Sequence, residues 1–300
     1  MQWDHEVDLV SVGSGAGALA AAIVAVDGGQ TVFAAQSAPR DQRSHRRLGI
    51  EMADSETNAY LDAVIEVAGT EMPDMAGPDL PVRFVTDPVP PSLGCNRRRA
   101  MIEPFVGARL GNWAADCVTA SHAVLYSHVT GRNMTTMRST SGEKLEAAVV
   151  GSVEPGVFGD GWSLDHWLSA EARSRGIDFR EDSSLERLVF DDGMVVGAVV
   201  MTPDGACAIS ARRGVVVATG GSRAVADRLP DETAVRVGVV SKTASRFGRV
   251  ELLARERAGS RLAAWTATGP VQPRQLRSHP LNSRARCHSI SPGPLHDGSL

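Results

Sequence analysis

The stretch Val12–Ala22, "VGSGAGALAAA", lies close to the start of the chain and decides the fold. It follows the mostly apolar run Val7–Val12, which is typical of a buried strand, and it leads into an alanine-rich helix that runs to about Val26. A second apolar strand, Thr31–Ala35, follows the helix. This order of strand, glycine turn, helix and strand predicts a βαβ unit.

The glycines of this turn match a pattern that binds the diphosphate of a dinucleotide. In GxGxxG, the first glycine makes the turn, the second lets the diphosphate approach the backbone, and the third lets the helix pack on the strand. Gly13, Gly15 and Ala18 occupy these positions, and Gly17 is an additional glycine. The N–H groups and the partial positive charge at the start of the helix would hold the diphosphate. A purely structural turn is the alternative that the pattern leaves open.

Composition narrows the class of partner. The chain has 300 residues, of which 43% are hydrophobic, so its length allows one large domain or two modest ones. Its formal net charge of −4 gives no basic excess of the kind that nucleic-acid binders carry. We therefore expect a small-molecule partner and no nucleic acid.

Targeting and metal signals are missing from the sequence. No apolar run reaches the ~18 residues that cross a bilayer, and the opening "MQWDHEVD" carries acids where a signal peptide carries cations. We therefore expect a cytoplasmic protein without a membrane span.

The cysteines form no CxxC pair, so we expect no metal site and no redox dithiol. They are Cys95, Cys117, Cys207 and Cys287.

Further helices and strands follow from periodicity and turn signals. Helices are expected over about 55–68, 105–117 and 164–174, and Ser55 stands where it would cap the first of them. A hairpin is expected over 135–150. A β-meander that returns to a buried strand is expected next, with strands at 177–180, 185–190, 195–201, 207–211 and 215–218.

The composition changes after Ser222. From Arg223 to Leu300 there are thirteen Lys or Arg residues against six Asp or Glu, with a single Phe and no Tyr. Such a segment buries too little apolar surface to offset the entropy that ordering costs. We therefore predict an irregular tail over 222–300, disordered from about Gly259, with one amphipathic helix over about 243–258.

A second glycine-rich strand end supports a resemblance to a known family. The stretch "RRGVVVATGGS", Arg212–Ser222, is an apolar strand that ends in Ala-Thr-Gly-Gly. Its place after the glycine turn, the helix and the β-meander resembles the flavoproteins of the fumarate reductase and succinate dehydrogenase family. The opening "MQWDHEVDLVSVGSGAGAL" is similar to that of FAD-dependent 3-ketosteroid dehydrogenases. The resemblance covers about residues 3–221 and includes "SETNAYLDAVIE", "NRRRAMIEPF" and "RLVFDDGMVVGAVV".

The resemblance implies an α/β fold, with a Rossmann-like FAD-binding domain and a β-meander. This domain would comprise residues 3–80 and 160–221. Residues 81–159 would be an inserted, incomplete cap region, and the tail over 222–300 would follow the second part of the FAD-binding domain. The implied cofactor is FAD. Its implied contacts are Gly13, Ser14, Gly15, Ala16, Gly17 and Ala18 at the diphosphate, Gln36 and Ser37 at the second strand, the backbone near Leu185 at the adenine, and Ala218, Thr219 and Gly220 on the ADP half.

The chain departs from the family pattern beside the implied cofactor. The family has a glutamate at the end of the second strand, which accepts hydrogen bonds from ribose hydroxyls, whereas this chain has Gln36. The Gly-Gly turns that cover the diphosphate in the family are replaced by "SAPRDQRSHRRLGIEM". A solvated loop is one interpretation of its basic cluster, and recognition of the 2′-phosphate of NADP is another. Contact with the FAD diphosphate is a third. The cluster comprises Arg40, Arg43, Arg46 and Arg47.

Candidate catalytic groups are few. Tyrosines act in the ketosteroid enzymes, and this chain has only two, Tyr60 and Tyr126. We expect both of them, and the nearby His122 and His128, to be structural, so no catalytic residue is assigned.

The resemblance implies an FAD-dependent oxidoreductase of the ketosteroid dehydrogenase type, which would move hydride from an apolar, ketone-bearing substrate to flavin N5. Two alternatives stay open. A truncated, catalytically inactive FAD-binding fragment is one, and an NADP-binding reductase is the other.

Overall fold

A computed structural model places the glycine turn between β1 (His5–Gly13) and α1 (Ala16–Asp27), and β2 (Val32–Gln36) follows the helix. β1 and β2 pair in parallel, which confirms the predicted βαβ unit. All the residues described belong to one unit, Met1–Ala258. They are residues 2–37, 53–66, 80–86, 106–118, 120, 122–154, 162–218 and 235–255.

Three further helices and ten further strands complete the described part of the chain. The helices are α2 (Ser55–Glu66), α3 (Val106–Val118) and α4 (Leu164–Ser174). The strands are β3 (Val82–Val85), β4 (Ala123–Tyr126), β5 (Thr135–Arg138), β6 (Lys144–Val153), β7 (Phe179–Arg180), β8 (Ser184–Asp191), β9 (Met194–Thr202), β10 (Gly205–Ala218), β11 (Val235–Ser241) and β12 (Phe247–Arg255). The helices, the hairpin and the meander strands therefore lie close to their predicted bounds.

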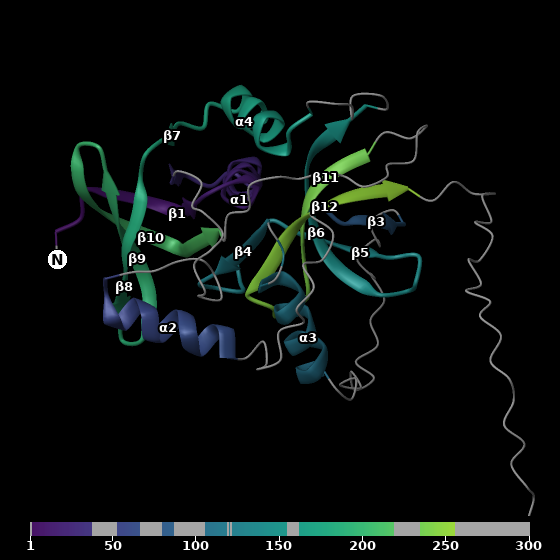
Figure 1. The fold of residues 1–300 in the computed structure, drawn as a ribbon, viewed down its shortest axis with the longest axis horizontal. Coiled ribbons are helices and arrows are strands. Elements are labelled where there is room, and N and C mark those ends of the chain that lie inside the picture. The colour runs from purple at the N-terminus through teal and green to yellow at the C-terminus, as the bar shows by residue number, and fades with distance from the viewer. Residues whose placement is uncertain are drawn as a thin grey trace, which may run out of the picture. The chain divides into compact units, whose positions relative to one another are not determined.

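These strands form one mixed sheet in the described residues (Figure 1). Its main path runs β5-β6-β11-β12-β4-β10-β1-β2-β7, with β3 on β12 and the pair β8-β9 on β10. α1 and α4 contribute to the apolar core on one face of the sheet, and α2 and α3 contribute to a second core. The α/β class and the Rossmann-like unit predicted from the sequence are confirmed.

β10 joins the meander to the parallel strands. Its first half pairs antiparallel with β9, its end at Val216–Ala218 pairs antiparallel with β4, and β1 pairs in parallel with it from Ile209 to Ala218. The sequence predicted two strands, at 207–211 and 215–218. The structure has one continuous strand that bends at Gly214, where φ is +116°. A glycine adopts this conformation without the steric cost that a Cβ would add.

Residues 235–255 correct the prediction for the tail. They form β11 and β12, so the predicted helix over about 243–258 and the irregular character of this part are wrong. β12 lies between β11 and β4 and pairs with β3 as well. Its apolar residues are buried on both faces, and such a run cannot be told from a buried helix by periodicity alone. Residues 259–300, where disorder was predicted, lie outside the described residues.

Part of the predicted insertion over 81–159 extends the main sheet. β4 pairs with β10, and β6 pairs with β11. The predicted division into domains stays a prediction.

The cap of α2 also differs from the prediction. The Asp54 carboxylate, rather than the Ser55 hydroxyl, accepts a hydrogen bond from the backbone N–H of Thr57, at 2.7 Å. The hydrogen bonds from Thr57 hold the pKa of Asp54 below its usual value. Both residue types are common helix caps, so the sequence alone did not distinguish them.

A buried ion-pair network fastens β12 to β3. The Glu251 side chain is fully buried, and its Oε1 accepts hydrogen bonds from Arg83 Nη2 at 2.9 Å and from Arg249 Nε at 2.7 Å. Arg83 also bonds Glu143, at 3.1 Å, and the guanidinium of Arg249 lies 4.9 Å from the centre of the Trp113 ring. The hydrogen bond from Glu251 raises the pKa of Arg83. Because the Glu251 carboxylate accepts hydrogen bonds from both arginines, neither guanidinium is left as an uncompensated charge.

We expect Glu251→Ala to lower the free energy of unfolding by about 3 to 5 kcal/mol, because Arg249 loses its bonded carboxylate in a largely buried position and Arg83 keeps only the partly exposed Glu143. Glu143→Ala removes a carboxylate from the same network whose side chain is 43% exposed, so it should cost about 1 kcal/mol or less. Urea unfolding of the two variants measures the difference. Equal losses of unfolding free energy in the two variants would show that the burial of Glu251 adds nothing to the contribution of the network.

Candidate functional site

The glycine turn lies where the C-terminal ends of three parallel strands meet. Gly13 at the end of β1 pairs with Gln36 of β2 on one side and with Ala218 of β10 on the other. Two backbone hydrogen bonds connect the residues at this edge. Ser37 N donates to Gly13 O at 3.2 Å, and Ser183 N donates to Gln36 O at 3.1 Å. In open α/β sheets, ligands bind outside the carboxyl ends of such strands.

Gly13 is required by the approach of β10. A Cβ on Gly13 would lie 2.4 Å from the carbonyl oxygen of Ala218, and its φ of +137° is also unfavourable for other residues. Gly15 stands at the N-cap of α1 with φ +77°. These two glycines let the backbone leave β1 and enter α1 without adding side chains of their own over the turn.

Gly17 lets α1 pack closely on the sheet. A Cβ at this position would lie 2.9 Å from Ala123 O and 2.9 Å from Val124 Cγ1. In the GxGxxG pattern, the third position, which packs the helix on the strand, corresponds to Ala18. Ala18 is itself fully buried, and its carbonyl accepts a hydrogen bond from Ser11 Oγ at 2.8 Å. The additional glycine of the turn therefore makes a close helix–strand contact, which the spacing of the motif alone did not indicate.

The start of α1 has the properties of an anion site. In the described part of the chain, no side chain caps the helix, and its first turn contains no acidic residue. Within these residues, the first turn therefore carries no charge that neutralises the partial positive charge of the helix N-terminus. Gly13, Ser14 and Gly15 are partly exposed, whereas Ala16, Gly17 and Ala18 are buried. A diphosphate fits this arrangement, because the exposed backbone can bind it while the buried residues fix the helix.

The structure brings most of the predicted contact residues together. Gln36, Ser37 and Ala218 lie beside the glycine turn. Leu185, at the start of β8, is partly buried and lies two residues beyond Ser183, which bonds the end of β2. Two predicted contacts, Thr219 and Gly220, and the arginine cluster at positions 40, 43, 46 and 47 lie outside the described residues.

The two tyrosines have structural surroundings. The Tyr60 hydroxyl accepts a hydrogen bond from Arg246 Nη1 at 3.1 Å, and its ring packs edge-to-face on Phe190. Tyr126 is 5% exposed, and burial raises its pKa to about 12. Tyr126 pairs with Val216, which lies two positions before Ala218, the last residue of β10. Neither tyrosine is placed at the glycine turn.

Signals for metals and membranes are likewise absent from the described residues. They contain no cluster of His, Cys, Asp and Glu that could hold a metal ion. Cys117 and Cys207 are free thiols, and burial raises the pKa of both. In this part of the chain, no helix is long and apolar enough to cross a membrane.

A family model described as "FAD binding domain" matches residues 8–246. The match begins within β1 and continues into the turn before β12, so it includes the glycine turn, the meander and β11. A search of curated proteins found no match.

Three solved structures show distant similarity. An open conformation of a flavocytochrome c3 fumarate reductase is 21% identical, with a TM-score of 0.31, and the match covers 72% of this chain and 34% of that one. A 3-ketosteroid-Δ4-(5α)-dehydrogenase from Rhodococcus jostii RHA1 is 18% identical, with a TM-score of 0.30 and coverage of 72% and 46%. A geranylgeranyl bacteriochlorophyll reductase-like protein from Thermoplasma acidophilum is 14% identical, with a TM-score of 0.29 and coverage of 82% and 57%. The chain therefore spans between about a third and somewhat more than half of these proteins.

We expect Gly17→Ala to destabilise the protein. On helix propensity alone this change should stabilise α1 by about 1 kcal/mol. The new Cβ would instead lie 2.9 Å from a backbone oxygen of β4, so the helix must move away from the sheet. Thermal unfolding measures the sign of the change. A higher melting temperature would show that α1 does not depend on this close contact.

Proposed function

Since the chain belongs to the FAD-binding domain family and its cofactor is FAD, we propose that it is an FAD-dependent oxidoreductase acting on an apolar, ketone-bearing small molecule of the 3-ketosteroid type. The observation that carries the proposal is the uncapped start of α1, which faces the ends of β1, β2 and β10. A cytoplasmic location is part of the proposal.

The proposed cofactor contacts follow the edge of the sheet. Backbone N–H groups from Gly13 to Ala18 hold the diphosphate at the positive end of α1. Gln36 and Ser37 receive the ribose of the adenosine half. The backbone near Leu185 lies by the adenine, and Ala218, Thr219 and Gly220 line the ADP half. When bound, FAD supplies a ring that accepts hydride at N5.

A second function has one observation in its favour. In the described residues, the Tyr60 hydroxyl is bonded to Arg246 and the Tyr126 hydroxyl is buried, so neither is placed to exchange a proton with a substrate at the glycine turn. A protein that binds FAD without turning over a substrate is consistent with this arrangement. We keep it as the alternative.

The visible spectrum of the purified protein tests the proposal. We expect a yellow protein with a flavin absorption band, which bleaches when a 3-ketosteroid is added without oxygen, because hydride then passes to the flavin. Retention of FAD without bleaching by any ketosteroid would favour the non-catalytic alternative. A colourless protein that FAD does not reconstitute would contradict both.

We expect Gln36→Glu to tighten FAD binding about tenfold, because a carboxylate accepts a ribose hydroxyl in a charge-assisted hydrogen bond. Gln2→Glu is the matched control, since it introduces the same charge at an exposed residue before β1 and should leave FAD affinity unchanged. Quenching of flavin fluorescence on binding gives both dissociation constants. If the two variants bind FAD equally well, Gln36 does not contact the ribose.

A further inference from the structure

A buried hydroxyl lies within the mostly apolar strand β1. Ser11 pairs with Ala34 of β2 on one side and with Val216 of β10 on the other, and its side chain is fully buried. Both partners belong to the core that contains α1, so Ser11 is on the face of the sheet that this helix covers. Burying a hydroxyl costs free energy unless it is hydrogen-bonded, so the partner of Ser11 indicates its role.

The hydroxyl links β1 to the first turn of α1. Ser11 Oγ donates a hydrogen bond to the carbonyl oxygen of Ala18 at 2.8 Å. Ala18 is the third residue of α1, and a carbonyl inside a helix accepts from the N–H group four positions further on. The hydrogen bond from Ser11 is therefore additional to those that form the helix. It connects the helix to the strand at the turn where we place the diphosphate.

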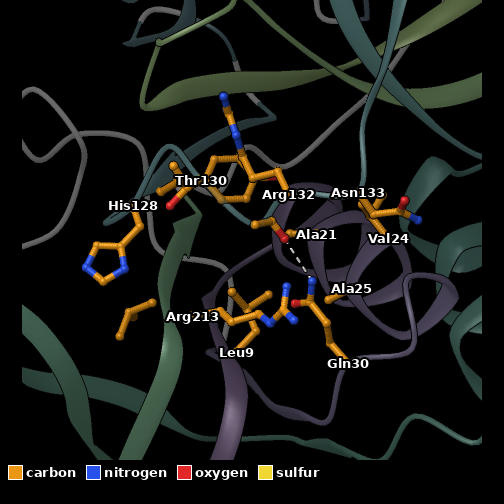
Figure 2. A pocket seen from close by; sticks show the side chains of 13 residues that line it. Leu9, Ala21, Val24, Ala25, Gln30, His128, Thr130, Arg132, Asn133 and Arg213 are labelled. Carbon is orange, nitrogen blue, oxygen red and sulfur yellow. Dashed lines mark hydrogen bonds between the residues drawn. The ribbon is translucent and has the colours of Figure 1, made fainter. Parts of the chain in front are cut away.

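Apolar contacts alone do not fix the rotation of α1. Its buried residues are all apolar or glycine, and six of the ten are alanine. Hydrophobic attraction has no direction, and small side chains interlock little with a sheet. In the middle of the helix, Ala21, Val24 and Ala25 border a pocket (Figure 2). A helix with this surface can rotate or slide at small cost unless a directional contact holds it.

Other polar contacts hold the opposite end of α1. Asp27, the last residue of the helix, bonds Arg175 Nε at 2.8 Å. Just beyond the helix, Gln30 Nε2 donates to Gly131 O at 2.9 Å (Figure 2). Because these contacts are at the end away from the glycine turn, they do not decide where the first N–H groups of α1 point. The hydrogen bond from Ser11 acts at the first turn itself.

We propose that Ser11 is a positioning residue for the diphosphate of FAD. Gly17 sets how closely α1 approaches β4, and the Ser11 hydroxyl fixes the rotation of the first turn about the helix axis. The N–H groups at the start of α1 are then oriented before the cofactor arrives. Because Ser11 is fully buried, it acts on FAD through α1 and not by contact. The inference rests on the proposed diphosphate site and is independent of the ketosteroid substrate.

Ser11→Ala should slow the binding of FAD. Without the hydroxyl, the first turn of α1 occupies the position that binds FAD only part of the time, and the apparent affinity falls by that fraction. We expect the dissociation constant to rise about fivefold. The change should appear as slower association, because the bound complex keeps its contacts with FAD.

Stopped-flow quenching of flavin fluorescence measures both rate constants, with FAD added to the full chain freed of cofactor. An unchanged association rate constant in Ser11→Ala would overturn the proposal, whether or not dissociation becomes faster. Faster dissociation alone would mean that the substitution removes a contact of the bound complex rather than the orientation of the free helix.

Ser241→Ala is the matched control. The Ser241 side chain is also fully buried, and its Oγ also donates to a backbone carbonyl at 2.8 Å, that of Phe247. It additionally accepts a hydrogen bond from Arg132, so its removal should lower the melting temperature at least as much. Three strands separate β11 from β1, which is about 20 Å across the sheet. FAD association should therefore change by less than about twofold. Equal slowing in the two variants would show that FAD binding follows general stability, and the proposal would fail.

Amide hydrogen exchange tests the same contact without a ligand. The N–H groups of Leu19 and Ala20 close the first turn of α1, and in Ser11→Ala we expect them to exchange about fivefold faster. The amides of the last turn, Val24–Asp27, should change by less than about twofold, because only the start of the helix is released. Unchanged exchange at Leu19 and Ala20, or equally faster exchange along the whole helix, would contradict the proposal.

These measurements separate the inference from the proposed function. FAD binding and amide exchange do not require steroid turnover, so a chain that binds FAD without oxidising a ketosteroid leaves the test of Ser11 intact. If the original chain binds no FAD, the proposed function fails, and the role of Ser11 in FAD binding fails with it. Slow exchange at Leu19 and Ala20 that depends on Ser11 would then show a structural contact alone.

Discussion

The approach of β10 to the glycine turn is the contact on which the rest of the described fold depends. The backbone of Ala218 lies so close to Gly13 that a single Cβ would collide with it, and Gly17 allows the same closeness between α1 and β4. Because both positions lack side chains, the helix start lies directly at the strand ends. The N–H groups that we propose as the diphosphate site are therefore positioned by close backbone packing.

This arrangement leaves each face of β4 in a different environment. Val124 and Tyr126 belong to the core that contains α1, whereas Ala123 and Leu125 belong to the core that contains α2 and α3. The strand alternates between two fully buried faces, so neither face could be solvated. Tyr126 lies on the α1 side, where its hydroxyl is buried and makes no hydrogen bond within the described residues.

Local signals made much of the fold predictable. Glycine turns, Asp-Gly turns and apolar periodicity predicted the βαβ unit, the meander and three further helices within a few residues. The candidate site was predictable for the same reason, since a glycine motif sets both the turn and the ligand-binding backbone. The role of Gly17 was not, because it arises from Ala123 and Val124, which lie more than a hundred positions further along the chain.

The sequence by itself determined the turn at Gly13–Gly17, the strands that flank it and the family to which the chain belongs. Only the tertiary structure decided that residues 235–255 are strands, because β12 is stabilised by pairing with β11, β4 and β3 and by the Glu251 network with Arg83. Composition near these residues suggested a solvated tail. Hydrogen bonds and ion pairs to partners far away in the sequence outweigh local preference, and a local pattern does not contain them.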